Sequence, residues 1–213
     1  MDMDLFIAAF TTFFVVMNRL GVAPIFASLT QDGGPAHARK MAVKSVMIAA
    51  LILLFFSFAG TWLLGTLGIS LDAFRAAGGA LLFLIALDMV FEKRAERQKN
   101  RADQVLERQE EHGEPEDISV FPIATPMLAG PGSIATAMLF VSNAEGAFAG
   151  QLVVLGAIGA NLAIVFALLL VAGPFVRFIG DAAAQSISRI LGVILAALSA
   201  QLMIDGLRGA FSG

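Results

Sequence analysis

The chain has 213 residues, of which 58% are hydrophobic and 15% are charged, and its mean hydropathy is +0.82. A soluble protein of this length needs more polar surface, so the composition places the chain in the membrane class. Cysteine is absent, which excludes disulfides, thiolate metal sites and cysteine nucleophiles. The net charge of −3 says little about partners, but the lack of a basic face argues against nucleic acid.

A membrane-spanning helix needs about 20 mostly apolar residues. Several segments reach or approach this length, and we predict that each of them crosses the membrane. They are residues 5–30, 43–69, 72–91, 119–142, 149–173 and 187–207. The predicted fold is therefore an all-α membrane protein with six transmembrane helices.

The first predicted span contains Asn18, Gly21 and Pro24 in its interior. Proline removes a backbone donor and clashes with the preceding turn, so we expect this helix to break between residues 18 and 24. Broken backbone at membrane depth is tolerated only against protein or a water-filled cavity. The segment is therefore a candidate substrate site, and the alternative is a kink that serves only helix packing.

One ionisable side chain, Arg19, lies inside the same span. An ionisable group within the membrane is a functional candidate by default. Its guanidinium could pair with a substrate carboxylate, or with Asp88 or Asp205. Alternatively, the side chain could reach one membrane interface. We predict that it faces the protein interior and donates hydrogen bonds to backbone carbonyls near the break.

The third predicted span of each half begins with the pattern Arg-x-x-Gly, at Arg75–Gly78 and at Arg189–Gly192. The first span of each half contains a Pro and Gly break. We therefore predict an internal repeat of three helices, residues 1–91 and 119–213. Because three is odd, the second repeat inserts upside down relative to the first, which makes the repeats inverted.

Residues 92–118 are polar and carry charges of both signs, which indicates a solvated linker that is helical at its start. Lysine and arginine are concentrated in this linker and at Arg39, Lys40 and Lys44. Basic loops stay on the cytoplasmic side of a membrane. We therefore predict a cytoplasmic linker and both termini outside.

The fourth predicted span contains the second break, followed by two hydroxyl side chains. Its candidate site residues are Pro126, Gly130, Pro131, Gly132, Ser133 and Thr136. Paired breaks at corresponding positions of two repeats are the best sequence pointer to the substrate site of a transporter. A helix that restarts after a break presents its N–H groups and positive end to an anion.

Two amides lie in the later spans. Asn161 and Gln201 either line the transport path or join helices to one another. The chain has no cluster of His or carboxylate residues with metal-ligand spacing, so we expect no metal and no cofactor.

Two motifs resemble the MarC family of integral membrane proteins, which includes SnatA-type transporters of small neutral amino acids. The second-half motif comprises residues 121–126 and 129–136, and the first-half motif comprises residues 21–26 and 28–30. Arg19 and Val22 depart from the family pattern, which usually has Pro and commonly has Asn at these two positions. The resemblance covers essentially the whole chain.

The resemblance implies a multi-pass secondary transporter of the inner membrane, with an inverted repeat and with glycine and alanine as the best-supported substrates. Its partners would be a small-molecule substrate and the lipid bilayer, and coupling to protons and assembly into a homo-oligomer are open possibilities. The alternatives are an exporter of another small metabolite or drug, and an intramembrane enzyme with re-entrant loops. An enzyme would need clustered Glu, Arg and Ser residues at the breaks, and of these types only Arg19 and Ser133 are found there.

We expect the ligand to lie near the bilayer midplane, between the two breaks. Its carboxylate would meet the N–H groups of residues 130–133, and its ammonium group would meet carbonyls near Asn18. Leu20, Val22 and Leu128 would then limit ligand size, so glycine and alanine should be preferred over leucine.

Overall fold

The computed structural model describes residues 2–91, 93–112, 117–144 and 148–212, and no strand occurs among them. Within these described ranges, ten helical elements follow one another. They are α1 (Asp2–Val16), α2 (Arg19–Thr30), α3 (Gly34–Thr66), α4 (Leu71–Val90), α5 (Lys93–His112), η1 (Ser119–Leu128), α6 (Pro131–Asn143), α7 (Phe148–Leu170), α8 (Ala172–Ile179) and α9 (Asp181–Ser212).

Four helices (α3, α4, α7 and α9) are individually long and apolar enough to cross a membrane. Two further spans are formed by bent helix pairs. The pair α1 and α2 bends by 43°, and the pair η1 and α6 bends by 55°. The all-helical fold class is therefore confirmed, with up to six spans and with breaks in the first and fourth of them.

Local sequence explains where the uninterrupted spans begin and end. Helix α3 begins with Pro35 in its first turn, where a missing backbone donor costs nothing. It ends before Gly68, whose φ of 67° turns the chain toward α4. The hydroxyl of Ser70 then accepts a hydrogen bond of 3.1 Å from the backbone N–H of Ala73 and caps α4.

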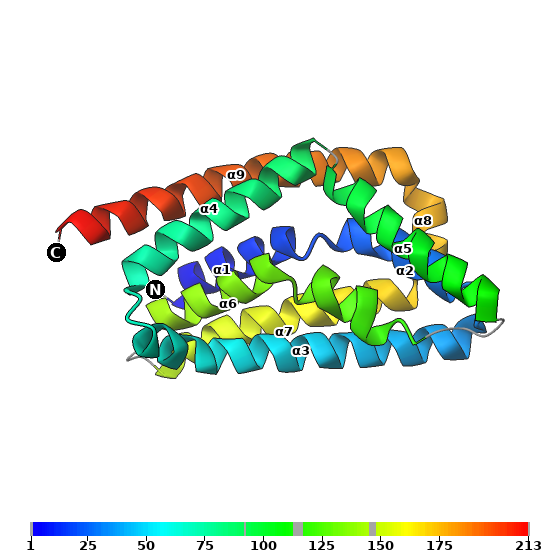
Figure 1. Cartoon of the computed structure of the whole chain (residues 1–213), viewed down its shortest axis with the longest axis horizontal. Coiled ribbons are helices and arrows are strands. Elements are labelled where there is room, and N and C mark those ends of the chain that lie inside the picture. The colour runs from blue at the N-terminus through cyan, green and yellow to red at the C-terminus, as the bar shows by residue number, and fades with distance from the viewer. Residues whose placement is uncertain (1, 92, 113–116, 145–147, 213) are drawn as a thin grey trace.

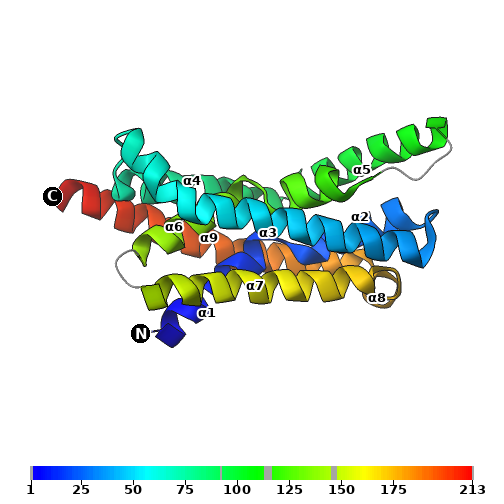
Figure 2. The same ribbon diagram turned by 90° about the horizontal axis from the view of Figure 1, so that it is seen from below.

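The helices form an elongated bundle with both chain ends at one end of it (Figure 1). Helix α5 lies at the opposite end, as Figure 2 also shows. The termini and the linker helix are thus on opposite ends of the bundle, an arrangement compatible with an even number of spans in two inverted repeats.

The third helices of the two predicted repeats, α4 and α9, pack against each other along much of their length. Glycine makes this close approach possible. A Cβ atom at Gly79 would lie 2.8 Å from the backbone nitrogen of Met203, and one at Gly206 would lie 2.5 Å from that of Ala76. Gly192 of the second Arg-x-x-Gly pattern lies in the same interface. A Cβ atom built at Gly78, of the first pattern, would not contact α9.

The linker is not solvated along its whole described length. Ala102 and Val105 of α5 are buried in the same apolar cluster as residues of α2. Arg97 of α5 forms an ion pair with Asp88 at the end of α4. Residues 92 and 113–116 of the predicted linker lie outside the described residues.

The short helix α8 was not predicted. It lies between α7 and α9 and packs against α2. It ends at Gly180, whose φ of 73° lies in the region that favours glycine. Its existence depends on tertiary packing, because an isolated helix of this length is unstable in water.

Candidate functional site

The first break is centred on Asn18. Its φ of 40° and ψ of 51° are left-handed, a conformation that asparagine tolerates better than most residues. The carbonyl of Asn18 accepts a hydrogen bond of 2.9 Å from the N–H of Gly21, so the chain is helical again at once.

The predicted extent of this break, residues 18–24, is therefore wrong, because Gly21 and Pro24 both lie inside α2. Pro24 falls in the second turn of the helix, where it removes a single intrahelical hydrogen bond. Membrane helices tolerate such a loss where neighbouring groups compensate. Here Val22, Ala23 and Phe26 are fully buried among other helices.

The second break depends on proline and glycine. Phe121 and Thr125 have extended backbone conformations, and each is followed by a proline joined through a cis peptide bond. The N–H of Ala129 donates a hydrogen bond of 2.8 Å to the carbonyl of Ala124. Gly130 follows in an extended conformation, and α6 starts at Pro131. The second break thus lies where the sequence predicts it.

Gly130 is required by a close approach of the backbone. A Cβ atom at this position would collide with the carbonyl oxygen of Pro126. The main chain at Gly130 therefore lies directly against the carbonyl group of Pro126, which leaves no room for a side chain at Gly130.

The two breaks lie close together inside the bundle. A Cβ atom at Gly132, in the first turn of α6, would lie 3.0 Å from Cγ1 of Val16 at the end of α1 and 2.7 Å from Cδ1 of Ile85. Helix α1 packs against α6, and α2 packs against η1, so the broken spans run side by side. The beginnings of α2 and α6 and the ends of α1 and η1 consequently lie in the interior of the bundle (Figure 1).

Arg19 is the first residue of α2, and its side chain is only 4% exposed. Its Nη2 atom donates a hydrogen bond to Oδ1 of Asn161, and its guanidinium lies 3.9 Å from the centre of the Phe14 ring. Nε and Nη1 are buried and have no hydrogen-bond partner among the described residues.

The prediction that Arg19 faces the interior is confirmed, but the protein groups predicted to pair with it, the backbone carbonyls, Asp88 and Asp205, are wrong. No contact joins it to a backbone carbonyl within the described part of the chain. Asp88 pairs with Arg97 instead, and Asp205 accepts a hydrogen bond of 2.8 Å from Gln201 on its own helix. Arg19 does not extend to a membrane interface either, because it is almost completely buried.

Asn161, on α7, is held in one orientation. Its Nδ2 atom donates to the carbonyls of Phe10 at 3.2 Å and of Ala157 at 2.8 Å. The amide oxygen is therefore the atom left to accept from Arg19. Across the same break, Asn18 accepts a hydrogen bond of 3.2 Å from Ser188 of α9. The first break is thus joined to α7 and α9 by polar side chains.

The polar residues after the second break are buried and locally bonded. The hydroxyl of Thr136 donates a hydrogen bond of 2.7 Å to the carbonyl of Gly132, and Ser133 is 2% exposed. Leu128 and Val22, which were predicted to limit ligand size, are fully buried.

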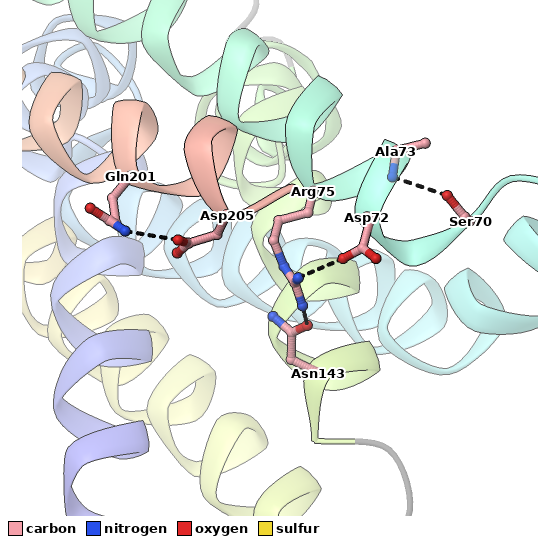
Figure 3. Close-up of polar contacts among 7 residues, drawn as sticks. All are labelled: Ser70, Asp72, Ala73, Arg75, Asn143, Gln201 and Asp205. Atoms are coloured by element: carbon pink, nitrogen blue, oxygen red, sulfur yellow. Dashed lines mark hydrogen bonds and ion pairs between the residues drawn. The ribbon is translucent and has the colours of Figure 1, made fainter. Parts of the chain in front are cut away.

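A separate polar cluster lies where α4, α6 and α9 approach the end of the bundle that carries both termini. Figure 3 shows Arg75 between Asp72, to which it donates at 2.8 Å, and Asn143 at the end of α6. The pair of Gln201 and Asp205 lies on α9 nearby. Gln201, predicted either to line the transport path or to join helices, donates a hydrogen bond to Asp205 on its own helix.

The structure contains a cavity of about 340 Å³ between α3, α6 and α7. It is lined by Ser57, Phe58, Thr61, Trp62, Val141 and Gln151. None of the predicted site residues lines it, and most of the residues around the two breaks are buried instead.

Sequence reasoning missed three groups at the first break: the ring of Phe14, the carbonyl of Phe10 and the hydroxyl of Ser188. Phe14 lies one turn and a bend before Arg19, so its contact depends on the angle between α1 and α2. Ser188 was placed in the sixth span without a role. No signal in a single sequence identifies these contacts, because the first depends on a bend angle and the other two join residues more than 150 positions apart.

Up to six apolar helical spans, two of them broken at points that meet in the interior, define a multi-pass integral membrane protein. The chain belongs to the MarC family: the family described as MarC family integral membrane protein matches residues 3–211.

The chain is similar to several curated members along nearly its whole length. It is 38% identical to a UPF0056 membrane protein of Methanocaldococcus jannaschii over 212 residues, covering 99% of both chains. It is 33% identical to one of Aquifex aeolicus, covering 96% of this chain and 92% of the relative. It is 30% identical to the UPF0056 membrane protein YhcE of Escherichia coli, covering 100% and 96%. No solved structure matches the chain.

Proposed function

We propose that this protein is a secondary transporter of small neutral amino acids, such as glycine and alanine, that works by alternating access. The observation that carries the proposal is the meeting of two broken spans, where Gly132 of α6 lies against Val16 of α1. Broken helices at equivalent positions of two repeats form the substrate sites of many secondary transporters.

The ends of the four half-helices suit a zwitterion. The beginnings of α2 and α6 offer backbone N–H groups and the positive ends of helix dipoles to a carboxylate. The ends of α1 and η1 offer carbonyl groups to an ammonium group. Because Leu128 and Val22 are buried near the breaks, a small side chain fits this region better than a leucine side chain.

The transport experiment uses purified protein in proteoliposomes. We expect uptake of radiolabelled glycine and alanine above that of protein-free liposomes, with much lower uptake of leucine. The comparison is made with and without an imposed proton gradient, which tests coupling. Uptake of none of these amino acids in either condition would contradict the proposal and favour an exporter of another small metabolite.

The proposed topology has inverted repeats, an outside location for both termini and a cytoplasmic linker in the inner membrane. It is supported by the position of both chain ends opposite α5 (Figure 2) and by the basic residues of the linker. A single cysteine introduced by Asn100→Cys in this cysteine-free chain should react with a membrane-impermeant reagent only from the cytoplasmic side. Labelling only from outside would reverse the orientation.

A further inference from the structure

We propose that Arg19 binds the carboxylate of the transported solute at the beginning of α2, so that a carboxylate is required for transport. The inference rests on the proposed transport function, and it goes further by choosing one of the two interior helix N-termini as the carboxylate site. The sequence left two places for the carboxylate, Arg19 and the N–H groups of residues 130–133, and the inference chooses Arg19.

The first step in the argument is the charge of Arg19. The guanidinium remains protonated under all ordinary conditions, and the side chain is 4% exposed. A buried charge is expensive unless it is paired. Within the described residues, its polar contact is the neutral amide of Asn161, and its other contact is the face of the Phe14 ring. Among the described residues, no carboxylate is therefore paired with this buried cation.

The second step concerns the direction of its free donors. The amide of Asn161 is fixed by the carbonyls of Phe10 and Ala157, and so it holds Nη2 of Arg19 in place. Nε and Nη1 have no hydrogen-bond partner in the part of the chain that the structure describes. A guanidinium held in this way presents a planar set of donors that matches the two oxygens of a carboxylate.

The third step is the position of Arg19 in the helix. A cation at the first residue of a helix is unfavourable, because the helix dipole is already positive there. The first turn of α2 contains no acidic residue that would offset it. The guanidinium and the helix end therefore add their positive potentials at the break, and an anion that binds there relieves both.

The beginning of α6 lacks these features. Its first turn contains no charged side chain, and the Cα face of Gly132 is covered by Val16, Ile85 and Leu82. The hydroxyl of Thr136 is already bonded to Gly132. Of the two interior helix N-termini, that of α2 therefore has the donors and the charge for a carboxylate.

The test compares alanine with alaninamide, which keeps the methyl and ammonium groups but lacks the carboxylate. We expect the wild-type protein in proteoliposomes to take up alanine at least about tenfold faster than alaninamide, the discrimination typical of a charge-assisted hydrogen-bonded pair. Arg19→Gln should lose about tenfold or more of the alanine uptake and most of the preference over alaninamide. Arg19→Lys should keep part of both.

The matched control is Arg97→Gln, which removes an arginine that pairs with Asp88 outside the break and should leave the preference unchanged. A purely structural role of Arg19 would lower the uptake of both compounds equally, and this result would overturn the proposal. Equal uptake of alanine and alaninamide by the wild-type protein would also overturn it, even if Arg19→Gln does not fold.

A binding measurement separates this inference from the transport proposal. The thermal unfolding temperature of the purified protein in detergent should rise with millimolar sodium acetate but not with acetamide. In Arg19→Lys, the rise caused by acetate should be reduced or absent. Stabilisation by acetate without amino acid uptake would contradict the proposed substrate and support the carboxylate site. Uptake of alanine with equal stabilisation by acetate and acetamide would contradict the site and leave the transport function standing.

Discussion

At the first break the chain turns on Asn18, and polar side chains from α2, α7 and α9 surround the bend. At the second break the chain turns on Pro126 and Gly130, with backbone packed directly against backbone. The first arrangement places a charge in the interior, whereas the second brings helix ends close together without one. The two breaks therefore differ in chemistry: the first carries a buried charge, and the second is formed by close backbone packing.

The largest loss of uptake is expected when a side chain is added at Gly132, where the two breaks meet. Gly132→Val should reduce amino acid uptake in proteoliposomes to background, because its side chain would overlap Ile85 and Val16 between the two breaks. Gly156→Val is the control, since no atom lies within 4 Å of a Cβ at that position of α7. Normal uptake by a folded Gly132→Val protein would show that the second break does not adjoin the substrate.

At the first break, we expect Asn161→Ala to cause the largest loss of stability. The substitution removes the hydrogen-bond acceptor of Arg19 and leaves a further buried donor unpaired, at a cost of about 1–3 kcal/mol in unfolding free energy. A double-mutant cycle with Arg19→Gln, followed by thermal unfolding in detergent, measures the coupling. Strictly additive effects of the two substitutions would mean that this contact does not stabilise the break.

A smaller change is expected when the bend itself is altered. Asn18→Ala should lower the unfolding free energy by about 1–2 kcal/mol, because alanine disfavours the left-handed conformation found at φ 40°. Asn18→Gly should avoid this strain and lose only the hydrogen bond from Ser188. The two variants should therefore differ in thermal stability, and equal stabilities would indicate that the break relaxes when Asn18 is replaced.

The smallest expected effect on stability comes from the ion pair of Lys44 and Asp117, outside the membrane and just before the second broken span. Hydrogen bonds from Lys44 and Ser119 lower the pKa of Asp117 to about 2. Because the folded-state pKa is depressed, the contribution is present above the unfolded value of about 3.9 and is lost as the pH falls through about 2. Both side chains are partly exposed, so the gain stays below about 1 kcal/mol.

Thermal unfolding between neutral and acidic pH tests this prediction. Lys44→Gln should reduce stability slightly at neutral pH and should flatten the loss of stability below about pH 3.9. An unchanged pH profile in the variant would show that Lys44 and Asp117 do not interact in solution.

The sequence predicted the second break well because proline and glycine restrict the backbone locally, wherever the rest of the chain lies. It extended the first break too far, to Pro24, because a proline can be accommodated in the second turn of a buried helix; asparagine at position 18 permits the left-handed conformation found there but does not require it. The partner of Arg19 could not be predicted either, since Asn161 is 142 residues away and belongs to another helix. The burial of Ala102 and Val105 in the linker was missed for the same reason: it depends on tertiary packing.

The close contact of α4 and α9 has a mechanical consequence. Gly79, Gly192 and Gly206 bring the two helices to within atomic contact of each other's backbone, so sliding one along the other would force main-chain atoms to overlap. Helices α4 and α9 should therefore move together as one rigid body. Any opening of the interior must then occur along its other face, where Leu82 and Ile85 of α4 rest on the glycine at the start of α6.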